Sequence, residues 1–192
     1  IETDGKISFE GFAKGRMTDT DLPAFGVNLN VDDAKFKYPD LPKSVDNIQI
    51  AMNASNSGGS DDNTVVDIKK FHLEMGDNPI DIKLLVKTPV SDPDMAGAFK
   101  AQIDMASVKD FIPVEEGESY TGNITCDIDF AGKLSTIDAE DYENFEAKGN
   151  FIVLDMNYKT ADMPYQIDVK NTSYQFNYKE NLIFKTFLTQ EM

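Results

Sequence analysis

Large apolar residues alternate with polar ones along most of the chain. Between positions 25 and 31, for example, every second residue is large and apolar: Phe25, Val27, Leu29 and Val31. An alternation of period two is typical of a strand that buries one face. The same pattern recurs at 5–17, 34–38, 48–52, 66–75, 80–86, 96–105, 122–134, 147–158, 165–169, 174–178 and 182–188. It predicts about twelve strands in all.

The connections between these segments are short. Positions 76–79 (GDNP) and 89–93 are turns rich in Gly, Pro and Asp, and 53–63 is a polar loop of Asn, Ser, Gly and Asp. Such connections leave no room for crossover helices, so consecutive strands are expected to be antiparallel. A bulge is expected at Lys69 and Lys70, where two polar residues interrupt the alternation of a strand.

Helical signals are scarce. The best candidate is 107–113, with Ser107 as the cap and Pro113 as the stop, and 137–145 could form a short helix or an ordered loop. The predicted fold is therefore mainly β, with long antiparallel strands and one or two short helices.

Part of the sequence occurs in two copies. The stretch 5–17 (GKISFEGFAKGRM) returns at 122–134 (GNITCDIDFAGKL), with Gly5 matching Gly122 across an offset of 117 positions. A second pair of stretches, beginning near Asp33 and Asp155, matches across an offset of 122 positions and includes Pro42 and Pro164. Two matches in the same order indicate a duplicated β unit.

The repeat suggests a division of the chain. We expect a first β repeat at 1–116, with a short helix near 107–112, and a second, truncated repeat at 117–192. Both would belong to one continuous domain excised from a larger protein. The two copies could form one sheet or two packed lobes.

The predicted strands each carry one apolar stripe. A sheet with one apolar face must cover it with another sheet, with helices or with a ligand, and helices are too scarce here. Either the sheet folds over itself as a sandwich, or it curves into a groove with an apolar floor that could hold lipid. The residues expected to line the groove are Ile7, Phe9, Val27, Leu29, Val31, Ile48, Ile50, Ile82, Leu84, Phe99, Ile103, Ile124, Ile128, Phe130 and Ile167.

Charge narrows the set of partners. The chain has 34 acidic and 18 basic residues, a formal net charge of −16, and 41% hydrophobic residues. Such a charge repels nucleic acid, which is bound by Lys and Arg that neutralise its phosphates. No cluster of basic residues for a phosphate head group is evident in the sequence. No apolar run approaches the roughly 20 residues of a membrane-spanning helix.

Signals for catalysis and metal binding are weak. The single histidine, His72, lies between two apolar strand residues and is expected to face solvent on the opposite side, and the single cysteine, Cys126, is expected to be buried and inert. Of the paired acids, Asp127 and Asp129 are expected on one strand face, roughly 7 Å apart at two strand steps. Glycosidases can use two carboxylates that close, but acids must cover the polar side of every strand here. We therefore expect no enzyme, no metal site and no cofactor.

Three stretches resemble the AsmA family of envelope proteins, particularly its Bacteroidetes forms. They are 71–81 (FHLEMGDNPID), 92–97 (DPDMAG) and 142–151 (YENFEAKGNF). The resemblance extends over nearly the whole chain, but it consists of strand and turn patterns and carries over no catalytic residue.

Similarity to AsmA implies a large periplasmic protein anchored in the inner membrane and related to repeating β-groove lipid transporters. The implied role is phospholipid transport or outer-membrane assembly and maintenance, with phospholipid acyl chains and envelope proteins as partners. The alternative is a β-rich module of the cell envelope that binds protein or glycan and has no role in lipid transport.

Overall fold

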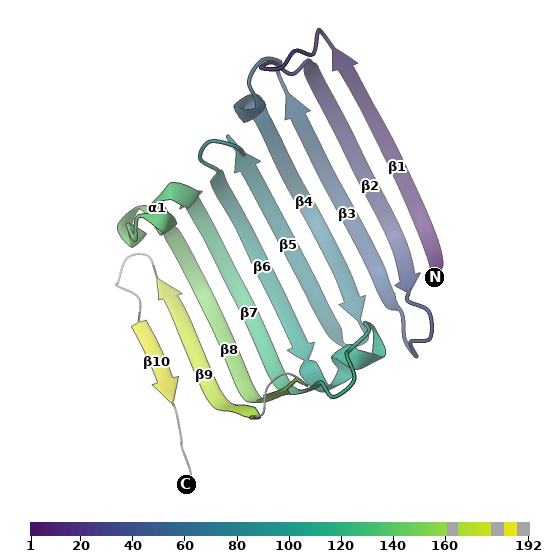
Figure 1. Ribbon diagram of the computed structural model, residues 1–192, viewed down its shortest axis with the longest axis vertical. Coiled ribbons are helices and arrows are strands. Elements are labelled where there is room, and N and C mark those ends of the chain that lie inside the picture. Colours follow the sequence, from purple (N-terminus) through teal and green to yellow (C-terminus); the bar gives the residue numbers. More distant parts are fainter. Residues whose placement is uncertain (161–164, 178–182, 188–192) are drawn as a thin grey trace.

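The protein forms one open antiparallel sheet. The computed structural model describes residues 1–160, 165–177 and 183–187. Ten strands lie side by side in the order of the sequence, so that strands next to each other in the sequence pair with each other (Figure 1). They are β1 (Glu2–Lys14), β2 (Ala24–Lys37), β3 (Val45–Asn56), β4 (Thr64–Met75), β5 (Asn78–Lys87), β6 (Asp94–Asp104), β7 (Ser119–Lys133), β8 (Glu146–Lys159), β9 (Ile167–Asn177) and β10 (Ile183–Phe187).

Short helical turns lie at both ends of the strands. The 3-10 turn η1 (Asp61–Asn63), the helix α1 (Leu134–Asp138) and the 3-10 turn η3 (Tyr142–Asn144) lie at one end, and the 3-10 turn η2 (Met105–Asp110) lies at the other (Figure 1). The prediction of a mainly β fold with long antiparallel strands is confirmed. The described residues form a single sheet, so they form neither the sandwich nor the two packed lobes that the sequence left open.

Two predicted interruptions are absent. The predicted strands at 25–31 and 34–38 are one strand, because β2 continues between them through a bulge at Asp33, whose φ is +50°. The predicted strands at 165–169 and 174–178 are not separate in the described residues, because Ile167–Asn177 forms one strand, β9, which pairs with β8 along its length. Polar residues in its middle, such as Thr172 opposite Val153, are still paired in the ladder.

Other boundaries also differ from the prediction. The polar stretch 53–63 is not all loop, because β3 continues to Asn56. The helical turn expected from Ser107 begins earlier, at Met105, and its cap is Asp104, whose carboxylate accepts a hydrogen bond from the backbone N–H of Ala106. The bulge expected at Lys69 and Lys70 is present, since the pairing of β4 with β5 shifts between Ile68 and Phe71.

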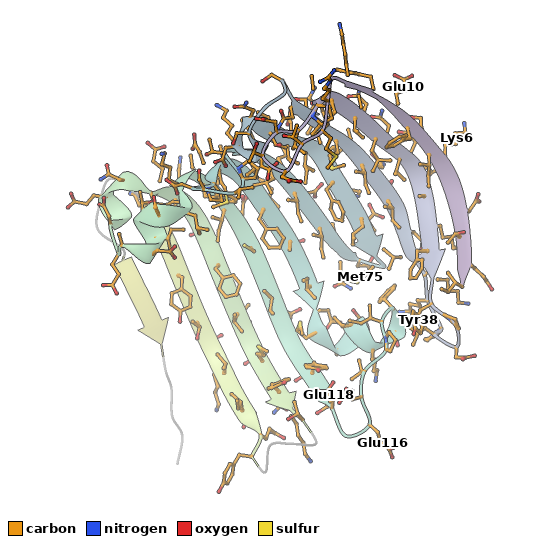
Figure 2. The ribbon with its side chains drawn as sticks, turned by 45° about the horizontal axis from the view of Figure 1, so that its top comes forward. Lys6, Glu10, Tyr38, Met75, Glu116 and Glu118 are labelled. Atoms are coloured by element: carbon orange, nitrogen blue, oxygen red, sulfur yellow. The ribbon has the colours of Figure 1, made fainter. Side chains whose placement is uncertain are left out.

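The two copies of the repeated stretch have the same irregularity. Opposite Gly5 the ladder of β1 and β2 shifts at Asp33, and opposite Gly122 the ladder of β7 and β8 shifts at Asp155. Asp33 and Asp155 have φ values of +50° and +47°. A bulge bends a strand, and β1 and β2 arch along their length (Figure 2). Pro164, the counterpart of Pro42, lies outside the described residues.

Candidate functional site

The strand register collects the apolar side chains on one side of the sheet. Residues directly opposite one another on neighbouring antiparallel strands share a face. One row across the sheet consists of Ile7, Val31, Ile50, Phe71, Ile82, Phe99 and Ile128. A second row consists of Phe9, Leu29, Met52, Ile68, Leu84, Gly97 and Phe130. The surface formed by these two rows and their neighbours is called the apolar face below.

The opposite surface, called the polar face, carries the intervening residues. One of its rows consists of Gln49, His72, Asp81, Lys100, Asp127 and Asn150. From β3 to β7, the strands that carry both sets of rows, the sheet therefore separates an apolar side from a charged side.

The residues expected to line a groove lie together. All of them lie on the apolar face by their register. Ile167 lies opposite Tyr158, beyond the bulge of β8, and is 45% exposed. At the other side of the sheet Ile7 and Phe9, on the edge strand β1, are 72% and 67% exposed.

Among the described residues, no second layer of structure covers the apolar face. Its deeply buried members are small or β-branched, namely Val31, Ala101, Cys126 and Val153, and their larger neighbours shield them. The larger side chains, such as Phe99 and Ile128, are half-buried. A contiguous apolar surface that stays partly exposed marks an interaction or ligand-binding site.

The segment after β6 closes one end of the sheet. Phe111, which follows η2, is 2% exposed and lies against Gly76 in the turn between β4 and β5. Lys43, in the loop between β2 and β3, lies over the Phe111 ring, and its Nζ is 2.9 Å from a carboxylate oxygen of Asp110. The backbone N–H of Lys43 also donates to the carbonyl of Asp110. Contacts with the β4–β5 turn and with the β2–β3 loop therefore hold η2 and Phe111 against this end of the sheet.

Asn78 fixes this closing segment to the sheet. Its side chain is 5% exposed and donates hydrogen bonds to the carbonyl of Met75 (2.6 Å) and to Oγ of Ser107 (2.8 Å). Its Oδ1 accepts a hydrogen bond from the backbone N–H of Asp104 (2.7 Å). One amide therefore joins the β4–β5 turn to both the cap and the body of η2.

The opposite end is closed by the segment between β7 and β8. Phe145 stacks on Phe130 of the apolar face with ring centroids 6.4 Å apart. Asp92 holds the start of α1, because its carboxylate accepts hydrogen bonds from the backbone N–H and the hydroxyl of Ser135 and pairs with Lys133. The bond from the Ser135 backbone, more than any other contact, lowers the pKa of Asp92 below its ordinary value.

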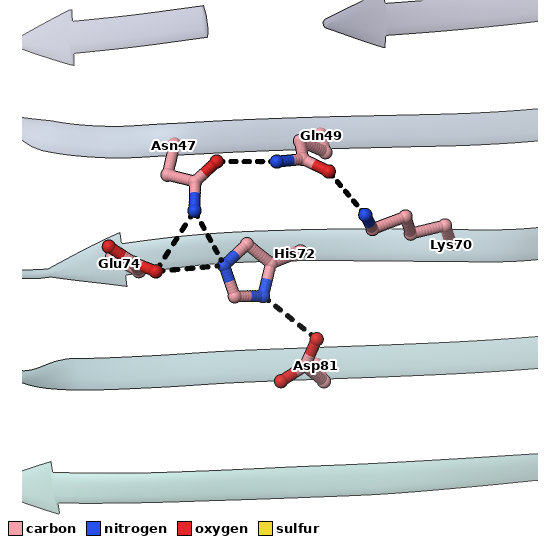
Figure 3. Close-up of polar contacts among 6 residues, drawn as sticks. All are labelled: Asn47, Gln49, Lys70, His72, Glu74 and Asp81. Atoms are coloured by element: carbon pink, nitrogen blue, oxygen red, sulfur yellow. Dashed lines mark hydrogen bonds and ion pairs between the residues drawn. The ribbon is translucent and has the colours of Figure 1, made fainter. Parts of the chain in front are cut away.

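His72 lies on the polar face, as expected, but it does not face solvent freely. Its side chain is 15% exposed because residues of three strands surround it (Figure 3). Nδ1 lies 2.8 Å from a carboxylate oxygen of Asp81, and Nε2 lies 3.2 Å from Oε1 of Glu74. Asn47 donates to the same oxygen of Glu74, which lowers the pKa of that carboxyl group. The expectation of a solvent-facing histidine was wrong because Asn47 and Asp81 of the two neighbouring strands, together with Glu74 of the same strand, surround the ring.

The remaining chemical candidates have structural roles or exposed positions. Asp127, one of the two neighbouring acids, forms a 3.0 Å ion pair with Lys100 on the polar face and its side chain is 55% exposed. Cys126 is buried on the apolar face, and burial raises the pKa of its thiol, which disfavours the reactive thiolate. In the described part of the chain, no three His, Cys, Asp or Glu residues are arranged to hold a metal ion.

Lysines gather at one corner of the sheet, which the sequence did not suggest. A shallow hollow of about 350 Å³ is lined by Lys35, Lys37 and Lys43, together with Phe111 and acidic residues. Lys35 pairs with Asp46 at 3.3 Å, and Lys43 pairs with Asp110. These lysines come from β2 and from the loop after it, so the fold assembles the cluster from positions 35–43 at the closed end of the sheet.

None of the helices in residues 1–160, 165–177 and 183–187 is long and apolar enough to cross a membrane. The chain matches no known protein family, no curated protein and no solved structure with which it was compared.

Proposed function

We propose that this chain is a non-enzymatic segment of an AsmA-like periplasmic protein, and that its apolar face holds phospholipid acyl chains during lipid transport or outer-membrane maintenance. The observation that carries the proposal is the row from Ile7 to Ile128, which crosses seven neighbouring strands without a charged residue. The described residues leave this row without a covering layer, so a ligand is the natural cover.

Acyl chains suit this surface better than a compact ligand does. Neighbouring strands lie about 4.8 Å apart, so the row extends roughly 30 Å across the sheet. Each CH₂ group that moves from water onto an apolar surface contributes about 0.8 kcal/mol, before the cost of ordering the chain. Contact along such a row needs no polar recognition, which fits a surface built from Ile, Leu, Val, Met and Phe.

The polar head group would remain at the edge of the sheet. A net charge of −16 disfavours phosphate over most of the surface. We expect the phosphate to lie at the lysine corner, where Lys35, Lys37 and Lys43 line one hollow. Acyl chains on the apolar face and a head group in water therefore agree with the distribution of charge.

Lipid analysis of the purified protein tests the proposal. Protein purified from cells without detergent should carry phospholipid that organic extraction and mass spectrometry detect. Phe99→Ser, on the apolar face, should reduce the amount bound, whereas Lys100→Ser, on the adjacent position of the polar face, should leave it unchanged. Absence of phospholipid from the folded wild-type protein would instead favour a module that binds protein or glycan.

A further inference from the structure

A polar cluster on three central strands plays no part in holding lipid. His72 of β4 lies between Asp81 of β5 and Asn47 of β3, and Glu74 of its own strand lies beside Asn47 (Figure 3). The ring is largely shielded from solvent, so these side chains take the place of water around both of its nitrogens. The set is called the His72 cluster below and consists of Asn47, Gln49, Lys70, His72, Glu74 and Asp81.

The amide of Asn47 has a defined orientation in the His72 cluster. Lys70 donates a hydrogen bond to Oε1 of Gln49, and Nε2 of Gln49 donates to Oδ1 of Asn47 (Figure 3). The Nδ2 of Asn47 therefore points the other way, and it lies 2.9 Å from Oε1 of Glu74 and 3.2 Å from Nε2 of His72. Asn47 reaches this position because the pairing of β3 with β4 shifts there, and its φ of +51° is one that Asn tolerates.

Two sets of hydrogen bonds fit the same positions. In a neutral ring, Nδ1–H donates to Asp81 at 2.8 Å, and the bare Nε2 accepts from Asn47. In an imidazolium both nitrogens carry a proton, so Nε2–H donates to Oε1 of Glu74 at 3.2 Å while Nδ1–H keeps its bond to Asp81. Protonation thus places one positive charge between two carboxylates and makes both bonds charge-assisted.

We propose that His72 is a pH-sensitive clamp, which holds β3, β4 and β5 together more tightly when its ring carries two protons. The bond to Asp81 joins β4 to β5, and the bond to Glu74 joins the ring to the carboxylate that Asn47 of β3 already holds. The clamp lies on the polar face, so it acts on the sheet from the side opposite the lipid and does not depend on a ligand there.

The negative charges around the ring come from three strands. Glu74 of β4 and Asp81 of β5 contact it, and Asp46 of β3 lies near Glu74. Hydrogen bonds from Asn47 and His72 lower the pKa of Glu74 below its ordinary value, although the charge of Asp46 acts in the other direction. Glu74 therefore remains an ionised acceptor under the conditions in which histidine takes up a proton.

The lysines of the same face are engaged elsewhere or lie farther along their strands. The amine of Lys70 donates to an amide of the His72 cluster, and Lys100, opposite Asp81 on β6, donates to a carboxylate of β7. Lys83 lies two positions beyond Asp81 on β5 and opposite Ala98 of β6. The groups in contact with the two ring nitrogens are thus the carboxylates and the amide of Asn47.

Protonation of the ring and folding are linked. An imidazolium finds two carboxylates in the folded sheet that it lacks in the unfolded chain, so folding favours the proton-bound form. The contribution of His72 to stability should therefore be full at low pH, and it should be lost as the pH rises through the range in which histidine titrates, about pH 5–8.

Urea denaturation of the whole chain tests the clamp. His72→Gln keeps a polar side chain that takes up no proton. The ratio of the unfolding equilibrium constants of His72→Gln and wild type should be about fivefold larger at about pH 5.5 than at about pH 8, the size expected for two partly exposed ion pairs. In a Glu74→Gln or an Asp81→Asn background this change should be smaller. Asp127→Asn, on the same face but paired with Lys100, is a control background that should leave it unaltered.

The same measurements can overturn the proposal. A ratio that stays constant between about pH 5.5 and about pH 8 would show that protonation of His72 does not tighten the sheet. A change that is as large in the Glu74→Gln and Asp81→Asn backgrounds as in the wild-type background would show that these carboxylates are not its partners.

Nitrogen-15 magnetic resonance of the folded wild-type protein tests the hydrogen bonds themselves. His72 is the single histidine of the chain, so the two signals of its ring nitrogens are unambiguous. At about pH 8 the proton should be on Nδ1, which faces Asp81, and a second proton should appear on Nε2 as the pH falls. A neutral ring protonated on Nε2 would overturn the proposal, because the bare Nδ1 would then face the carboxylate of Asp81.

Discussion

Single residues at the bulges determine how the strands bend. Gly5 and Gly122 have φ values of +126° and +97°, a region that residues with a side chain rarely adopt. A Cβ on Gly5 would lie 2.5 Å from Cα of Ala34, and a Cβ on Gly122 would lie 2.5 Å from Cα of Met156. In both copies of the repeat, the backbone of the neighbouring strand therefore leaves no room for a side chain at the glycine.

Substitution of these two glycines should destabilise the protein to different extents, because they lie at different positions in the sheet. Gly122→Ala should lower the free energy of unfolding by about 1–3 kcal/mol, because β7 is held between two strands and cannot move away from the added methyl group. Gly5→Ala should cost less, because among the described residues β1 pairs with β2 alone. Urea denaturation of both variants measures the difference, and an equal or larger loss for Gly5→Ala would contradict this account.

For single residues, the sequence predicted backbone irregularities such as bulges, but it did not predict which side chains contact each other. The pair Lys69 and Lys70 predicted a bulge because two adjacent polar residues break an alternation. The contacts of His72 could not be predicted, since Asn47 and Asp81 belong to neighbouring strands and only the register brings them together. The alternation placed His72 on the correct face and said nothing of its neighbours.

Among the elements, η2 and the residues after it form the closure of one sheet end. The closure depends on the buried amide of Asn78, whose three hydrogen bonds join the β4–β5 turn to η2. Sequence reasoning placed a helical turn here but began it at Ser107, because Ser is a favoured cap. Asp104 acts as the cap instead, and the hydroxyl of Ser107 donates to its carbonyl.

Asn78→Ala should loosen this closure. The substitution removes the acceptor of the Asp104 N–H and both donors, and an unsatisfied buried polar group costs about 1–3 kcal/mol. Hydrogen exchange should accelerate in residues 104–112, while the central strands β5 and β6 keep their protection. Asn28→Ala, on the polar face of β2, is a control that should leave exchange in 104–112 unchanged. Unaltered exchange in Asn78→Ala would show that η2 is held by other contacts.

For the whole molecule, the sequence predicted a sheet with one apolar face but could not show what covers that face. Alternation of period two is the same for a strand in a sandwich and for a strand in an open groove. The choice depends on how the strands are ordered and on how far the sheet curves, and both arise from pairing between distant residues. The fold shows strands in sequence order in one open sheet, with its closures at the strand ends.

The central claim is that lipid lies on the apolar face. Site-specific photo-crosslinking with a benzophenone amino acid at Phe99, and separately at Lys100, tests it most directly, because these adjacent residues point to opposite faces. After illumination in cells, phospholipid should be covalently attached to the protein labelled at position 99 and absent from the protein labelled at position 100. Equal labelling at both positions, or no lipid at position 99 in a folded protein, would contradict the account.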